Sequence, residues 1–314
     1  MKNYILLASA AMMVATVSCT VDLTPKGEAP ASNEITFDAT DLTDIRPGEV
    51  ITATMVIPTG GKNILSEERG WKVDSDVLFS APYDYTESII GSGFPVLTVK
   101  EEGGKSILRF YCTSAGEHTV TYYTRYNWKG LTDGSTYKDV EVRKTITAIE
   151  GDIYNSKWGD SIEKTKRVHN GITQNSSNEN VYNGSFTDGG LSILMSFTFS
   201  NNKLAKIEEY FYTTKSGETL YNIFLRWHKK IQENQGFTYD SEHSTRNNIQ
   251  GQVIIAEANS EKAKAENAAL ISGELKSVHT VYSKTGTNAA IDLWVTEENG
   301  SKVFNFTRTY TPAN

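Results

Sequence analysis

Residues 191–212 read LSILMSFTFSNNKLAKIEEYFY, and they indicate how the second half of the chain folds. Segments 191–199 and 204–212 are rich in aliphatic and aromatic residues, as strands are. Asn201 and Asn202 lie between the two segments, and a two-residue turn favours asparagine because both of its residues need positive φ angles. The stretch therefore predicts an antiparallel β-hairpin.

Helical patterns lie on both sides of this hairpin. Asp160 stands three residues before Glu163, which is the spacing of a capping box, and Gly171 follows, so we expect a short helix that begins at Asp160 and runs to about residue 170. Beyond the hairpin, apolar residues at helical spacing predict a packed helix over residues 217–234: Leu220, Ile223, Phe224, Trp227 and Ile231. Residues 259–271 are rich in alanine and charge and predict a second, more exposed helix.

A second hairpin ends the chain. Residues 291–296 and 303–310 read as strands, joined through Asn299 and Gly300, a favoured type I′ turn pair. This hairpin matches the first in length, turn chemistry and aromatic placement, and each follows helical sequence. We therefore expect residues 151–314 to form an α+β domain, with helices packed on an antiparallel sheet and a helix-hairpin unit used twice.

The first half of the chain carries strand signals only. Candidate strands recur through residues 34–150 with turn residues between them, and no long helical pattern interrupts them. About seven strands at this spacing predict an all-β immunoglobulin-like sandwich over 34–150. Cys112 ends an alternating run on the same face as Leu108 and Phe110, so we expect a buried, unreactive thiol.

Two motifs resemble known families. Trp71-Lys72-Val73-Asp74, followed by residues 114–121 (SAGEHTVT), resembles PKD and related immunoglobulin-like modules. That resemblance implies a spacer, adhesion or ligand-binding module without catalysis, with Trp71 in its core. The run from Trp158 to Glu163 (WGDSIE) resembles the helix start of α+β lipoprotein domains of the SmpA/OmlA type and of β-lactamase-inhibitor-like repeats.

The N-terminus predicts the location of the protein. Residues 1–18 have the layout of a secretory signal, with one lysine before an apolar run too short to span a bilayer. Thr16-Val17-Ser18-Cys19 resembles a bacterial lipobox, which implies lipid attachment at Cys19. Residues 19–33 then form a flexible tether. The layout resembles outer-membrane lipoproteins of Bacteroidetes, with the side of the membrane left open, and an ordinary secretory signal is the alternative.

Charge and motifs argue against several function classes. The net charge is −7 without a basic stripe, which argues against nucleic acid binding. The five histidines show no metal-ligand spacing and no nucleophile or phosphate-loop motif occurs, so we expect no cofactor, no metal and no catalysis. Three possibilities stay open: a weak calcium site among the aspartates near residues 38–44 and 74–76, a cation in the polar loop at 240–244, and a hydrolase with scattered carboxylates.

Exposed aromatic residues are the best binding candidates. Aromatic rings can stack on sugars or serve as hot spots for protein contacts. The candidate residues lie in a long insert and at one strand end: Tyr83, Tyr85, Tyr126 and Trp128. The sequence therefore predicts a non-catalytic envelope protein that binds a glycan or another envelope protein. A carbohydrate-active hydrolase and an inhibitor-like protein-binding domain are the alternatives.

Overall fold

The computed structural model describes residues 27–73, 98–129, 135–188, 191–213 and 219–313. Cys19, Tyr83 and Tyr85 lie outside these ranges. The described residues are mostly strand and form three antiparallel sheets with three helices. They group into two compact units, of which the first comprises 27–32, 58–69, 124–129 and 135–140 and the second comprises the rest. The predicted domain boundary at residues 150 and 151 falls within the second unit and stays a prediction.

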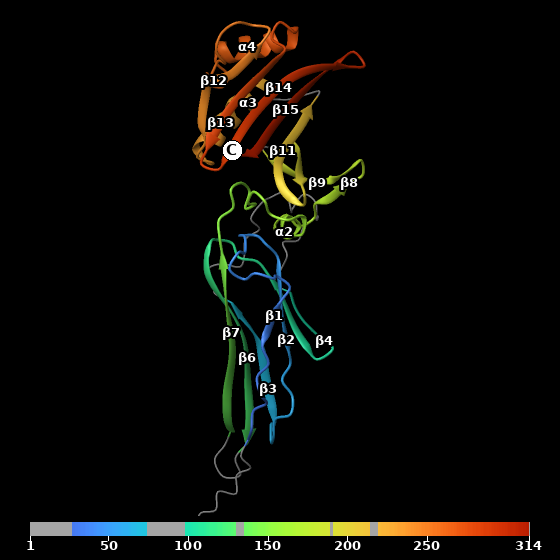
Figure 1. Cartoon of the computed structure of the whole chain (residues 1–314), viewed down its shortest axis with the longest axis vertical. Helices are drawn as coiled ribbons and strands as arrows, with labels where there is room; N and C mark the ends of the chain where they lie inside the picture. Colours follow the sequence, from blue (N-terminus) through green and yellow to red (C-terminus); the bar gives the residue numbers. More distant parts are fainter. Residues whose placement is uncertain (1–26, 74–97, 130–134, 189–190, 214–218, 314) are drawn as a thin grey trace, which may run out of the picture. The chain divides into compact units, whose positions relative to one another are not determined.

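An eight-stranded sheet dominates the second half of the chain (Figure 1). It contains β8 (Thr173–Asn175), β9 (Asn178–Asp188), β10 (Leu191–Ser200), β11 (Lys203–Thr213), β12 (Thr238–Asn247), β13 (Ser277–Lys284), β14 (Thr287–Glu298) and β15 (Ser301–Pro312). The strand order is β12-β13-β14-β15-β11-β10-β9-β8. Two four-stranded meanders, β8–β11 and β12–β15, therefore meet through their last strands.

Both predicted hairpins are confirmed. The turn between β10 and β11 has φ angles of 51° at Asn201 and 59° at Asn202, and the turn between β14 and β15 has 50° at Asn299 and 76° at Gly300. Two consecutive positive φ angles define a type I′ turn, whose twist matches that of the flanking strands. The short polar turns therefore set the register of these two strand pairs.

The helices are α2 (Ile162–Val168), α3 (Leu220–Glu233) and α4 (Glu261–Ser272). The five apolar residues predicted to face the core on α3 are all buried, which confirms its packed stripe. The predicted start of α2 is wrong by one residue, because Ser161 is the N-cap and its hydroxyl accepts from the Lys164 N–H. Asp160 instead accepts from the Lys157 N–H at 2.8 Å and pairs with Arg46 at 3.0 Å. The Asp160 carboxylate, which the local pattern predicts as the helix cap, thus pairs instead with Arg46, a residue distant in sequence.

All three helices pack on one face of the eight-stranded sheet. His169, which ends α2, contacts the Phe197 ring at 4.4 Å between centroids, and Trp227 of α3 lies 6.2 Å from Phe306. Leu270 of α4 belongs to the same core. Within the described part of the chain, no helix packs on the opposite face, and we call that opposite surface the open face of the sheet.

The prediction of a polar loop at residues 240–244 is wrong. The sequence indicates a polar loop there, but these residues belong to β12, which pairs with β13 at the edge of the sheet. The register shifts between Asp240 and Thr245, which marks a bulge. An exposed edge strand with a bulge has little apolar alternation, so its sequence resembles a loop.

The first half of the chain contains two further sheets. One has the order β1 (Ile35–Phe37), β2 (Ile51–Val56), β5 (Lys105–Phe110), β4 (Thr98–Glu102), and the other has β3 (Ser66–Val73), β6 (Gly116–Lys129), β7 (Ser135–Ala148). Residues from both sheets share one hydrophobic core, in which Cys112 is 0% exposed. The ring of Trp71 meets Tyr122 edge-on at 5.1 Å, and its Nε1 donates to Ser106 Oγ at 3.0 Å. Burial of Cys112 and core packing of Trp71 are thereby confirmed.

Ion pairs join residues 44–49 to α2. Arg46 is 1% exposed and pairs with Asp44 at 2.7 Å as well as with Asp160. Glu49, which is 0% exposed, accepts from Arg167 Nε at 2.9 Å. Removing one partner of a buried pair leaves an uncompensated charge, so this cluster couples the two halves of the predicted domain split.

Candidate functional site

The aromatic residues predicted to bind ligand do not form an exposed platform in the described structure. Tyr126 is 1% exposed, so its ring has no face on which a sugar could stack. Trp128 is half-buried, and Gly27 packs so closely on its ring that a Cβ at that position would collide with it. Tyr122 and Tyr123 do point to opposite sides of β6, as alternation predicts, since Tyr122 is buried and Tyr123 is half-exposed.

The five histidines lie on or beside different elements, and two of them pair with an aspartate. Among the described residues, no group of histidine, cysteine, aspartate and glutamate side chains could hold a metal ion. His169 and His228 are buried, and burial lowers their pKa values to about 3 and about 4. His243 is exposed, and its Nδ1 lies 2.7 Å from Asp240 Oδ2. His279 lies on the open face of the sheet.

Four side chains form a row across the open face. Register pairs join Tyr210 to Thr307, Thr307 to Asp292, and Asp292 to His279, on strands β11, β15, β14 and β13. Successive side chains of a strand point to opposite faces. Each of these residues therefore faces away from the helices, whereas their chain neighbours at 211, 306, 293 and 278 are buried beneath the helices.

Hydrogen bonds hold this surface in place. Tyr210 Oη donates to Asn305 Oδ1 at 2.9 Å, and Asn305 Nδ2 donates to Thr296 Oγ1 at 3.0 Å. His279 Nδ1 lies 2.6 Å from Asp292 Oδ1, and this hydrogen bond raises the pKa of His279. The donors and acceptors are thus positioned before any ligand arrives.

A half-buried indole lies beside the row. Trp294 is the register partner of Asn305 and belongs to the same face. Rings of tyrosine and tryptophan combine an apolar surface with a polar edge, which suits them to interfaces. The open face thereby presents parts of two aromatic rings together with the imidazole and carboxylate of His279 and Asp292, a composition that can recognise a polar ligand. Asn305 and Thr307 are buried beneath them.

Sequence reasoning missed this face, although the signal was present. The final hairpin was predicted, and alternation within it places Trp294 and Asn305 on the side opposite Leu293 and Phe306. Local sequence does not reveal which face of the sheet the helices cover, so the exposed face could not be predicted. Comparisons with family models, curated proteins and solved structures found no match for this chain.

Proposed function

We propose that this chain is a non-catalytic lipoprotein of the cell envelope that binds a glycan through the open face of its eight-stranded sheet. The observation that carries this proposal is the row formed by Tyr210, Thr307, Asp292 and His279, with Trp294 beside it. Preorganised groups lose little conformational entropy on binding, which favours affinity.

The chemistry of the face favours a sugar as ligand. Hydroxyl-rich ligands need both donors and acceptors, which the His279–Asp292 pair offers. The rings of Tyr210 and Trp294 can cover the apolar faces of sugar rings.

The first half of the chain would act as a spacer. Its strand orders, β1-β2-β5-β4 and β3-β6-β7, correspond to the ABED and CFG sheets of a constant-type immunoglobulin sandwich. With the predicted lipid at Cys19 and the tether at residues 19–33, such a module would hold the α+β part away from the membrane. In the described part of the chain, no helix is long and apolar enough to cross a bilayer.

A protein partner is the second candidate. The two meanders that meet at β11 and β15 are consistent with the predicted duplication, and Leu194 is 42% exposed on the open face. An exposed apolar side chain is buried more favourably by a protein surface than by a hydroxyl-rich sugar. An inhibitor-like domain would use the same face.

The test is a glycan array probed with residues 20–314 and with two variants. Trp294→Ala should weaken binding to the captured glycan about tenfold or more, because a central aromatic ring often dominates an interface. Tyr137→Ala is the matched control, since Tyr137 is 62% exposed on β7, a strand of the three-stranded sheet. Equal loss in both variants, or no loss in Trp294→Ala, contradicts the proposed site. No glycan bound at all would shift the proposal to a protein partner.

A further inference from the structure

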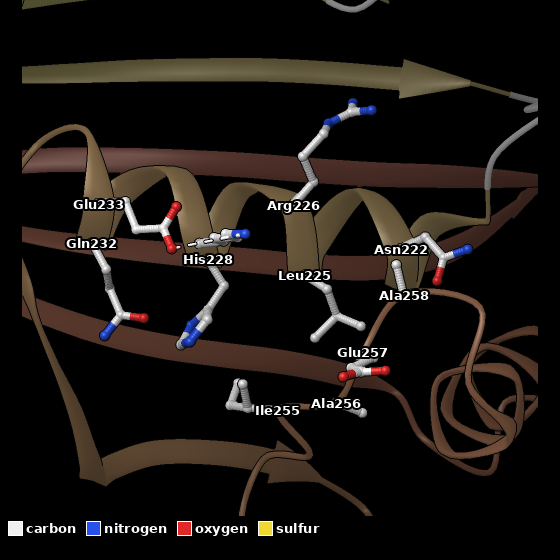
Figure 2. Close-up of a pocket in the computed structure, with 11 residues that line it drawn as sticks. Asn222, Leu225, Arg226, His228, Gln232, Glu233, Ile255, Ala256, Glu257 and Ala258 are labelled. Carbon is white, nitrogen blue, oxygen red and sulfur yellow. Dashed lines mark ion pairs between the residues drawn. The ribbon is translucent and has the colours of Figure 1, made fainter.

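A groove runs along α3 on the helical side of the sheet. Its volume is about 620 Å³, and it lies between α3 and the segment at residues 252–258 (Figure 2). Leu225 from the helix and Ile255 and Ala256 from the segment supply apolar surface. Ligand sites commonly have this size and this predominance of apolar lining. The groove shares no residue with the open face of the sheet.

His228 is a buried polar group directed into this groove. Its side chain points from α3 toward the segment that carries Ile255 (Figure 2), although the residue is only 6% exposed. Nδ1 lies 2.8 Å from Tyr282 Oη, whereas Nε2 makes no hydrogen bond with any described residue. Burial lowers the pKa of the imidazole to about 4, so the ring is neutral at pH 7. The groove thus offers one neutral polar ring beside its apolar lining residues.

The backbone of the other wall leaves its N–H groups unpaired among the described residues, although two of its carbonyls accept hydrogen bonds. Residues 252–257 run without a turn or bend and belong to no strand, and among the described residues their N–H groups donate no hydrogen bond. Tyr221 Oη donates to the Ile254 carbonyl at 2.7 Å, which fixes the segment to α3. Ile255 is 43% exposed at the edge of the groove. An unpaired run of this kind is a template for an added strand.

The geometry points to a peptide-binding site, in which an extended segment of a partner protein pairs with residues 252–257 and places an apolar side chain against Leu225 and Ile255, beside His228. Six extended residues span about 20 Å, enough for several main-chain hydrogen bonds and one or two inward-pointing side chains. A small apolar molecule could fill the cavity but would leave the backbone groups unpaired. An extended peptide would both fill the groove with a side chain and accept hydrogen bonds from the N–H groups of residues 252–257.

The charge of the groove predicts the character of the peptide. The charged lining residues are two cations and two anions: Arg226, Lys229, Glu233 and Glu257. Lys229 and Glu233 pair at 3.8 Å. Because the lining charges balance, binding should depend little on salt, and the side chain held in the groove should be uncharged.

The experiment selects peptides and then blocks the groove. A phage-displayed library of random peptides is panned on residues 20–314, and a selected peptide is labelled with a dye for anisotropy titration. Ala256→Trp should fill the groove and weaken binding about tenfold or more. Ala268→Trp, at an exposed position of α4, is the matched control and should leave the affinity unchanged. Hydrogen exchange at residues 252–257 should slow when the peptide binds.

Each outcome decides the question. Binding that persists in Ala256→Trp, or that leaves exchange at 252–257 unaltered, overturns the site. Failure to enrich any peptide overturns it as well, and an apolar dye such as anilinonaphthalene sulfonate that binds without any peptide would show a small-molecule cavity instead. Trp294→Ala should not affect peptide binding, so this proposal and the glycan proposal fail independently.

Discussion

Two buried histidines should make the fold sensitive to mild acid. His169 is 0% exposed, contacts Phe197, and has Nε2 at 2.7 Å from Ser156 Oγ, while His228 is 6% exposed. Burial disfavours the charged ring and lowers the pKa to about 3 for His169 and about 4 for His228. Both pKa values lie below the ordinary value of about 6.5 that each ring regains on unfolding.

The sign and size of the effect follow from these values. Between the folded and unfolded pKa values, the unfolded chain binds more protons than the folded chain, so stability falls as pH decreases through this window. At pH 5 the unfolded histidine is almost fully protonated and the folded one is not, and each site costs about 2 kcal/mol of stability relative to pH 8. His279 acts in the opposite direction because its pKa is raised, but it is 38% exposed and its effect is smaller.

Urea unfolding at pH 8 and pH 5 measures this loss. In His169→Phe the loss between the two pH values should shrink by about 2 kcal/mol, since an apolar ring at that position no longer takes up a proton on unfolding. His243→Gln is the control, because His243 is an exposed histidine, and it should retain the loss of the unaltered chain to within about 0.5 kcal/mol. If His169→Phe loses as much stability on acidification as the unaltered chain, then the inference from burial is refuted.

Three further changes test other parts of the structure. Arg308→Met should cost about 3–5 kcal/mol in urea unfolding because it leaves the Glu209 carboxylate buried without its cation, and adding Glu209→Leu should recover most of that loss. No recovery in the double variant would show that the cost comes from packing on Trp227, whose ring centroid lies 3.3 Å from the guanidinium carbon. Gly300→Ala should lower stability by about 1 kcal/mol, because φ is +76° there, and an unchanged melting temperature would contradict the strain. Cys19→Ala should move the protein from the membrane fraction to the soluble fraction of cells, and retention in the membrane would disprove the predicted anchor.

Local sequence determined the secondary structure and much of its order. Hairpins formed where paired turn residues such as Asn299 and Gly300 follow strand sequence, because positive φ angles are accessible to few residues. Helix α3 formed where apolar residues recur at helical spacing, because one face must leave water. These are properties of neighbouring residues, so a single sequence contains them.

Partners distant in sequence decided the rest. Arg46 takes the carboxylate of Asp160 and thereby moves the start of α2 by one residue. β12 becomes a strand because β13 offers it an edge, although its own sequence is that of a polar loop. The open face exists because the helices cover the opposite side of the sheet, and this choice alone leaves Trp294 and His279 accessible while Leu293 and Val278 are buried. Alternation assigns residues to two faces, but only tertiary packing determines which of the two faces meets water.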